Sequence, residues 1–101
     1  MSYFLYILES EKNKKFYVGI SSDPYKRLYF HNTLEKGFTA RYRPWKIVFV
    51  KEFGSKELAS KIEKKIKSMK SHSYVEKIVN NEYNIDYILE YLSDINSKES
   101  N

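Results

Sequence analysis

Two apolar runs joined by a short polar segment limit most strongly what this chain can fold into. Residues 3–8 and 16–20 are apolar at almost every position, which is typical of strands buried on both faces. The polar segment 9–15 leaves room for little more than a turn, so the two strands should form an antiparallel hairpin. We expect residues 3–8 to be the central strand of the sheet.

The segment after the hairpin carries the start signal of a helix. Asp23 followed by Pro24 is a favoured combination of N-cap and first helical residue, and predicts a helix that ends near residue 32. Residues 33–45 should then form a loop. The apolar run 47–50 predicts a third strand.

Three further helices are expected after the third strand. Ser55 should cap the first of them, and the sequence Ser73-Tyr74-Val75-Glu76 has a capping-box pattern that predicts a short second helix ending near residue 79. Residues 84–95 have the periodicity of an amphipathic helix. The order is then ββαβααα, an α+β fold in which a small three-stranded antiparallel or mixed sheet is flanked by helices.

Composition excludes several kinds of protein and site. The chain has 101 residues, which fit one domain, and it has no cysteine, which excludes disulfides, thiolate metal sites and a cysteine nucleophile. Its two histidines are too few for a His-rich zinc site. No apolar run approaches the roughly 20 residues of a membrane span, and no secretion signal is present, so we expect a cytoplasmic protein without membrane contact.

The charge distribution favours a polyanionic partner. Residues 80–101 hold five acidic residues and one basic residue, whereas residues 1–79 hold 17 basic and eight acidic residues, a net charge of +9. Nucleic acid is the commonest partner for a body of that charge, although a lysine-rich composition alone would produce a similar excess. The three arginines, Arg27, Arg41 and Arg43, lie close together in the sequence and are better phosphate clamps than lysine.

Several residues with chemical potential fall on neighbouring elements. Tyr6 and Tyr17 lie on adjacent strands, and Gly19 at the end of the second strand permits a close approach to the backbone. Arg27 and His31 are four residues apart on the first helix and therefore share a face. The alternatives are structural: two buried tyrosines with paired hydroxyls, an Arg27 ion pair with the helix cap, and a histidine at a helix C-terminus.

Two further groups are candidates outside this set. Glu63 lies beside the apolar stripe of the helix that follows the third strand, where a carboxylate can hold a cation, although a surface ion pair with a neighbouring lysine is the alternative. Arg41, Tyr42 and Arg43 could bind backbone phosphate and stack on a base, or Tyr42 could pack beneath its own loop.

The order and spacing of these residues resemble the GIY-YIG nuclease superfamily, in particular its small single-domain, UPF0213-like branch. The two strand motifs appear as Phe4-Leu5-Tyr6 and Tyr17-Val18-Gly19, and the Arg–His pair of the first helix appears as Arg27 and His31. The segment Thr39-Ala40-Arg41-Tyr42-Arg43-Pro44 is similar to the one that precedes the third strand in this branch, and the metal-binding glutamate falls on Glu63. The resemblance covers about residues 3–79, which would be the nuclease domain, with residues 80–101 as a C-terminal amphipathic helix and tail.

The resemblance implies a Mg²⁺-dependent endonuclease, with Mn²⁺ as a substitute, that hydrolyses nucleic-acid phosphodiesters, with DNA as the expected substrate, in one step. Glu63 would hold the metal and Arg27 would clamp the phosphate. Tyr6 would take a proton from the attacking water, which requires nearby cations to favour its phenolate. Tyr17 and His31 would orient or relay protons.

Two other interpretations remain open at this point. The first is a nucleic-acid-binding module that keeps the fold without catalysis. The second is a protein-interaction domain whose acidic helix over residues 84–95 docks on the basic face. The sequence indicates neither the oligomeric state nor whether the nucleic acid is single-stranded, duplex or branched.

Overall fold

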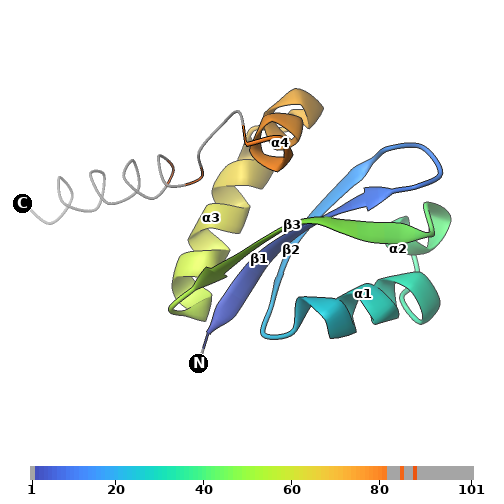
Figure 1. Ribbon diagram of the computed structural model, residues 1–101, viewed down its shortest axis with the longest axis horizontal. Helices are drawn as coiled ribbons and strands as arrows, with labels where there is room; N and C mark the ends of the chain where they lie inside the picture. The colour runs from blue at the N-terminus through green and yellow to red at the C-terminus, as the bar shows by residue number, and fades with distance from the viewer. Residues whose placement is uncertain (1, 82–84, 86–87, 89–101) are drawn as a thin grey trace, which may run out of the picture.

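The computed structural model describes residues 2–81, 85 and 88, and its centre is a three-stranded antiparallel sheet (Figure 1). The strands are β1 (Tyr3–Ser10), β2 (Phe16–Ser21) and β3 (Trp45–Phe53), in the spatial order β2-β1-β3. The predicted hairpin and the central position of the first strand are both confirmed. Because β1 is the central strand and helices cover both faces of the sheet, both sets of alternating side chains on β1 are apolar.

Over residues 2–81, four helices accompany the sheet. They are α1 (Pro24–Thr33), α2 (Phe38–Arg41), α3 (Lys56–Ser68) and α4 (His72–Val79). Asp23 caps α1 by accepting a hydrogen bond from the Lys26 amide at 3.1 Å, and Ser55 caps α3 by accepting one from the Leu58 amide at 3.2 Å. The α+β class and the predicted helix starts at Pro24 and after Ser55 are therefore confirmed.

Two local expectations differ from the structure. The expected loop over residues 33–45 contains the one-turn helix α2, which begins after Gly37. Helix α4 begins two residues earlier than the capping-box pattern predicts, because Ser71, and not Ser73, accepts the hydrogen bond from the Tyr74 amide at 3.0 Å. Ser71 can cap a helix as well as Ser73 can, so the capping-box pattern alone predicted the wrong N-cap residue.

The helices form one layer on each side of the sheet. Helices α3 and α4 lie over one face and α1 and α2 over the other, as Figure 1 shows. Alternation along β1 separates the two cores, since Leu5 and Ile7 pack with the α3 residues, whereas Tyr6 and Leu8 pack with Trp45 and Leu28. The candidate site residues of β1 and α1 therefore belong to the smaller of the two cores.

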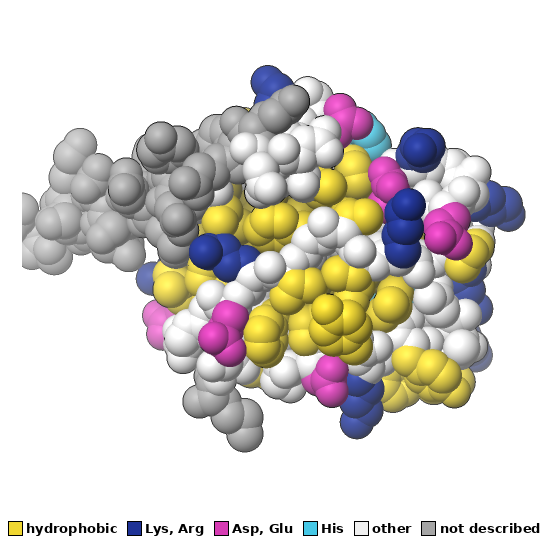
Figure 2. Space-filling model, viewed as in Figure 1, with side chains coloured by type: hydrophobic (Ala, Val, Ile, Leu, Met, Phe, Trp, Pro, Cys, Tyr) yellow, Lys and Arg dark blue, Asp and Glu magenta, His cyan; other side chains and the backbone are white. Residues whose placement is uncertain are grey.

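The predicted helix over residues 84–95 lies mostly outside the described residues. Ile85 and Ile88 are described, and both are buried in the core that α3 and α4 form on the sheet. Among the described residues, none of the helices is long and apolar enough to cross a membrane. On the face seen in Figure 2, hydrophobic side chains gather at the centre, and side chains of both charge signs surround them, so the positive excess is not collected on this face.

Candidate active site

The site starts from the register of the hairpin, which places Tyr6 opposite Gly19. A Cβ atom on Gly19 would lie 2.7 Å from both Cζ and the hydroxyl oxygen of Tyr6, and 3.1 Å from the ring of Tyr17. The missing side chain of Gly19 therefore makes room for the end of the Tyr6 ring. This is the close approach that the sequence predicts for Gly19.

The Tyr6 hydroxyl points at a histidine on the buried face of α1. The hydroxyl oxygen lies 2.9 Å from Nε2 of His31, and both side chains are about 1% exposed. Burial lowers the pKa of His31 to about 4; the positive charges of Arg27 and Arg43 act in the same direction, and Glu35 acts against them. At neutral pH the imidazole is thus uncharged, and one of its nitrogens can accept a proton.

The second nitrogen of the imidazole has no partner. Nδ1 of His31 is buried and makes no hydrogen bond with any described residue. A buried polar atom without a partner costs about 1–3 kcal/mol, so His31 does not maximise the stability of the fold. A catalytic role is one explanation for such an atom in a native structure. His31 does lie in the last turn of α1, as the structural alternative requires, but its ring is buried against Tyr6.

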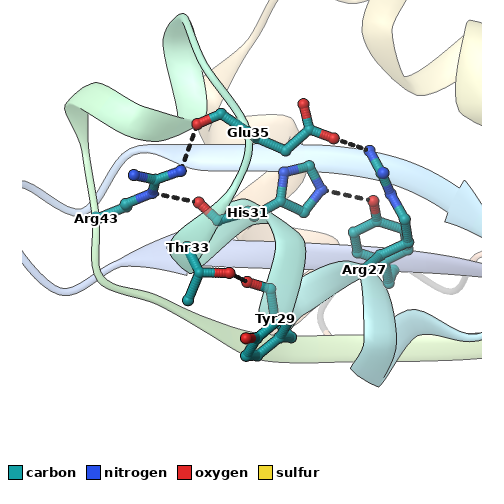
Figure 3. A network of polar contacts seen from close by, with 7 residues as sticks. Arg27, Tyr29, His31, Thr33, Glu35 and Arg43 are labelled. Atoms are coloured by element: carbon teal, nitrogen blue, oxygen red, sulfur yellow. Dashed lines mark hydrogen bonds and ion pairs between the residues drawn. The ribbon is translucent and has the colours of Figure 1, made fainter.

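Arg27 lies beside the same hydroxyl and is held in place by a glutamate. Its Nη2 atom is 2.9 Å from Oε1 of Glu35, and the two side chains are 37% and 35% exposed. Figure 3 shows the Arg27 and His31 side chains on the same side of α1, with Glu35 reaching Arg27 from the segment that follows the helix. The guanidinium therefore pairs with Glu35 and not with the helix cap Asp23, and it stays accessible to solvent.

The surroundings of Tyr6 favour its neutral form. Burial raises the pKa of Tyr6 to about 12; a hydrogen bond and the positive charge from Arg27 act in the opposite direction, while Tyr17 and Glu63 add to the rise. Arg27 therefore acts in the direction that a phenolate requires, but burial outweighs its effect on the pKa of Tyr6. Burial dominates because it removes the hydration that the phenolate needs.

Tyr17 connects the buried pair to the edge of the sheet. Its ring centroid is 4.7 Å from that of His31 and 6.3 Å from that of Tyr6. On its other side, the Nζ atom of Lys67 lies 5.7 Å from the same ring, which is a cation–π distance. Because β2 is an edge strand, a side chain from α3 can reach Tyr17 around that edge.

Glu63 approaches the site through this contact. Its Oε2 atom is 3.1 Å from Nζ of Lys67, and its side chain is 18% exposed. The pair has the i, i+4 spacing of an ordinary helical ion pair, which was the structural alternative. Direct contacts join Tyr6, Tyr17 and His31, and Glu63 is connected to them through Lys67, whose ammonium group lies over the Tyr17 ring. The negative charge of Glu63 is the smallest of the influences on the pKa of Tyr6.

The donor set of this region fits a hydrated Mg²⁺ ion better than a caged metal. The described residues contain no group of three or more His, Cys, Asp or Glu side chains that could hold an ion. Glu35 is engaged by Arg27, which leaves Glu63 as the carboxylate that can exchange its lysine partner for a metal. Mg²⁺ commonly binds through one or two carboxylates, with water and substrate phosphate as the other ligands. The residues present therefore fit this ion.

The three residues predicted to bind nucleic acid, Arg41, Tyr42 and Arg43, lie in different environments. Arg43 donates from Nε to the His31 carbonyl at 2.6 Å and from Nη2 to the Glu35 carbonyl, and so ties this segment to the end of α1 (Figure 3). Arg41 is exposed. Tyr42 is half-buried against Phe38 at a centroid distance of 4.9 Å. The role of all three in binding nucleic acid stays a prediction, and the contacts of Arg43 are structural.

The ion pair of Glu63 with Lys67 is the surface pair that the sequence offers as the alternative. Two residues near the site did not follow from the sequence. Glu35 holds Arg27. Asn32 exchanges two hydrogen bonds with the backbone of Trp45, at 2.7 and 3.1 Å, and so fixes the start of β3 against α1. Glu35 lies eight residues beyond Arg27 and past the helix end, so no helical spacing indicates that the two side chains meet.

This fold and this cluster of a buried tyrosine–histidine pair, an arginine and a carboxylate define a small nuclease-like domain. Residues 2–84 match the GIY-YIG catalytic domain family, and the chain belongs to that family. Membership implies a nuclease-like, nucleic-acid-cleaving function.

A comparison with curated protein sequences returned no match. Among solved structures, the chain is similar to a UPF0213 protein from Bacillus halodurans, determined by solution NMR, with 28% sequence identity and a TM-score of 0.52. The similarity covers 79% of this chain and 84% of that one. It agrees with the resemblance to the small single-domain branch.

Proposed function

We propose that the chain is a metal-dependent endonuclease that hydrolyses phosphodiester bonds of DNA by direct attack of water. The observation that carries this proposal is the buried hydrogen bond between Tyr6 and His31, beside the solvent-accessible guanidinium of Arg27. An uncharged, incompletely paired imidazole against a phenol is a costly arrangement for a core. It is a useful arrangement for moving a proton.

Tyr6 and His31 are proposed to act as a relay. Arg27 carries hydrogen-bond donors and no acceptor, so in the proposed relay the Tyr6 hydroxyl donates its own proton to Nε2 of His31. As Tyr6 takes a proton from the attacking water, it passes its own to His31. No free phenolate has to form, which suits a hydroxyl whose pKa is raised to about 12.

Arg27 is proposed to bind the phosphate on which negative charge develops. Its guanidinium is 37% exposed and keeps donors on the side away from Glu35, so it can contact phosphoryl oxygens without losing its partner. Charge-assisted hydrogen bonds of this kind strengthen as the transition state gains charge. Tyr17 would hold the ring of His31 in the orientation that the relay needs.

Glu63 is proposed to hold Mg²⁺, or Mn²⁺ in its place. When bound, such an ion would neutralise phosphate charge and help the leaving oxygen. Lys67 would then be released from Glu63, and its ammonium group could pair with a backbone phosphate of the substrate.

The test is cleavage of single-stranded and branched DNA in Mg²⁺ or Mn²⁺ by the parent protein, Glu63→Ala and Glu57→Ala. Glu57 is a matched control because it also forms an i, i+4 ion pair on α3, with Lys61 at 3.9 Å, and its side chain is 82% exposed. We expect the control to cleave like the parent and Glu63→Ala to lose activity by at least about 100-fold.

Each other result has a defined meaning. Equal cleavage by the parent and Glu63→Ala would contradict the assignment. DNA binding that weakens steeply with salt, without cleavage by the parent, would favour the non-catalytic binding module instead.

A further inference from the structure

A groove of about 260 Å³ opens at the edge strand β2, and Tyr17 and Lys67, which link the candidate active site to Glu63, contribute to its lining. It lies where α3 ends and α4 begins, against the edge strand β2, on the side of the sheet that both helices cover (Figure 1). Its base includes the buried residues Val18, Ile66 and Val75. Pockets for drug-sized molecules are roughly 300–1,000 Å³, so this groove suits one planar group of smaller size.

The walls of the groove are aromatic. His72 is exposed and stacks on Phe16, with ring centroids 4.7 Å apart and an angle of 27° between the ring planes. Tyr17, which also contacts His31 of the candidate active site, forms another part of the lining. Aromatic side chains that present a face to solvent are the platforms on which unstacked nucleobases bind.

The rim of the groove is positively charged. Lys67 and Lys70 line it, and both are exposed. Lys67 is also the ion-pair partner of Glu63, so the rim of the groove is in contact with the candidate metal-binding carboxylate. An aromatic slot with ammonium groups at its mouth is complementary to a base with its flanking phosphates.

From this arrangement we propose that the groove binds one unstacked base next to the scissile phosphodiester, and that the substrate is therefore single-stranded at that position. The proposal rests on the proposed function. A base inside a duplex is stacked on both sides and cannot enter the groove unless it leaves the helix. Stacking and lysine contacts read no base edge, so binding should show little sequence preference.

The experiment measures binding without cleavage. Oligonucleotides that carry 2-aminopurine at successive positions are titrated with protein in EDTA, as single strands and as hairpin duplexes. The variants are His72→Ala, His72→Phe, Lys70→Ala and the matched control Lys61→Ala, which removes a lysine from α3 away from the groove. Circular dichroism melting establishes that each variant is folded.

We expect the single strand to bind more tightly than the duplex, with a fluorescence change of similar size at each internal position of 2-aminopurine, because binding without sequence preference has no fixed register. His72→Ala should weaken binding by about tenfold and remove that change, while His72→Phe should restore both. Lys70→Ala should weaken binding by about threefold, and Lys61→Ala should bind like the parent.

The two proposals fail in different ways. If the parent cleaves DNA but His72→Ala and Lys70→Ala bind like Lys61→Ala, the groove assignment is wrong and the nuclease proposal stands. The groove assignment is also wrong if the duplex binds as tightly as the single strand and shows the same fluorescence change. If the parent neither binds nor cleaves nucleic acid, the proposed function fails, and the groove assignment fails with it.

Discussion

The ring of Tyr6 occupies the space that a side chain at position 19 would need. The two residues face each other across β1 and β2, and an added Cβ on Gly19 would meet the Tyr6 hydroxyl oxygen at 2.7 Å. The hydroxyl is thereby directed at Nε2 of His31, which lies 2.9 Å away on the buried face of α1. A glycine on an edge strand thus sets the position of a proton-carrying group on the neighbouring strand.

Gly19→Ala should disturb the site while leaving the chain foldable. The Tyr6 ring is enclosed, so it cannot move away at little cost, and we expect the free energy of unfolding to fall by about 1–3 kcal/mol. Gly54→Ala is the control, because an added Cβ there meets nothing within 4 Å. Urea unfolding measures both variants. Equal stability of the two would contradict the close packing of Tyr6 on Gly19.

Stability should fall as the solution becomes acidic, because of His31. Its pKa is about 4 in the folded protein and about 6.5 in the unfolded chain, so the unfolded chain binds a proton first. The free energy of unfolding should therefore decrease from about pH 6.5 down to about pH 4, by up to roughly 3 kcal/mol. Denaturant titrations of the parent and His31→Phe at several pH values across this range isolate the effect. If the free energy of unfolding depends on pH in the same way in both proteins, the prediction is wrong.

Tyr6→Phe should separate the chemistry of the hydroxyl from the packing of the ring. The variant keeps the ring beside Gly19 but leaves Nε2 of His31 without its partner, so we expect a loss of stability of about 1 kcal/mol. Cleavage should fall by about 10²–10⁴, the range typical of general acid–base groups. If single-turnover rates of the variant match those of the parent, Tyr6 is not the proton carrier.

Alanine substitutions of Arg43 and Arg41 should affect the stability of the protein differently, although the two residues are only two positions apart. Arg43→Ala removes two hydrogen bonds to the carbonyls of His31 and Glu35, and should lower the free energy of unfolding by about 1–3 kcal/mol. Arg41→Ala removes an exposed side chain and should change it by no more than about 0.5 kcal/mol. Thermal melts that order the two variants the other way would contradict the structural role of Arg43.

Much of the fold could be predicted because its signals are local. The apolar run of β1 indicates a strand covered on both faces, and Asp23-Pro24 indicates a helix start, since each pattern depends on neighbouring residues. Helix α2 and the start of α4 could not be placed as well. Gly37 precedes the one-turn α2 in a segment without periodicity, and Ser71 and Ser73 offer the same cap chemistry.

The site was predictable in its members but not in its electrostatics. The spacing of Arg27 and His31, together with the family resemblance, selected a set of residues of which Tyr6, Tyr17 and His31 are in contact with one another. The rise in the pKa of Tyr6 depends on how deeply the ring is buried, and the pairing of Arg27 with Glu35 depends on the path of the chain after α1. Neither property is encoded in a sequence spacing.

The central claim is that a divalent ion bound at Glu63 lies beside the Tyr6–His31 pair. Broadening of backbone amide resonances by substoichiometric Mn²⁺, with an oligonucleotide bound, tests it without requiring activity. We predict that the amides of Gly19 and of residues 63–67 broaden in the parent and stay sharp in Glu63→Gln. Broadening that is unchanged in Glu63→Gln, or that is centred on another part of the protein, would contradict the claim.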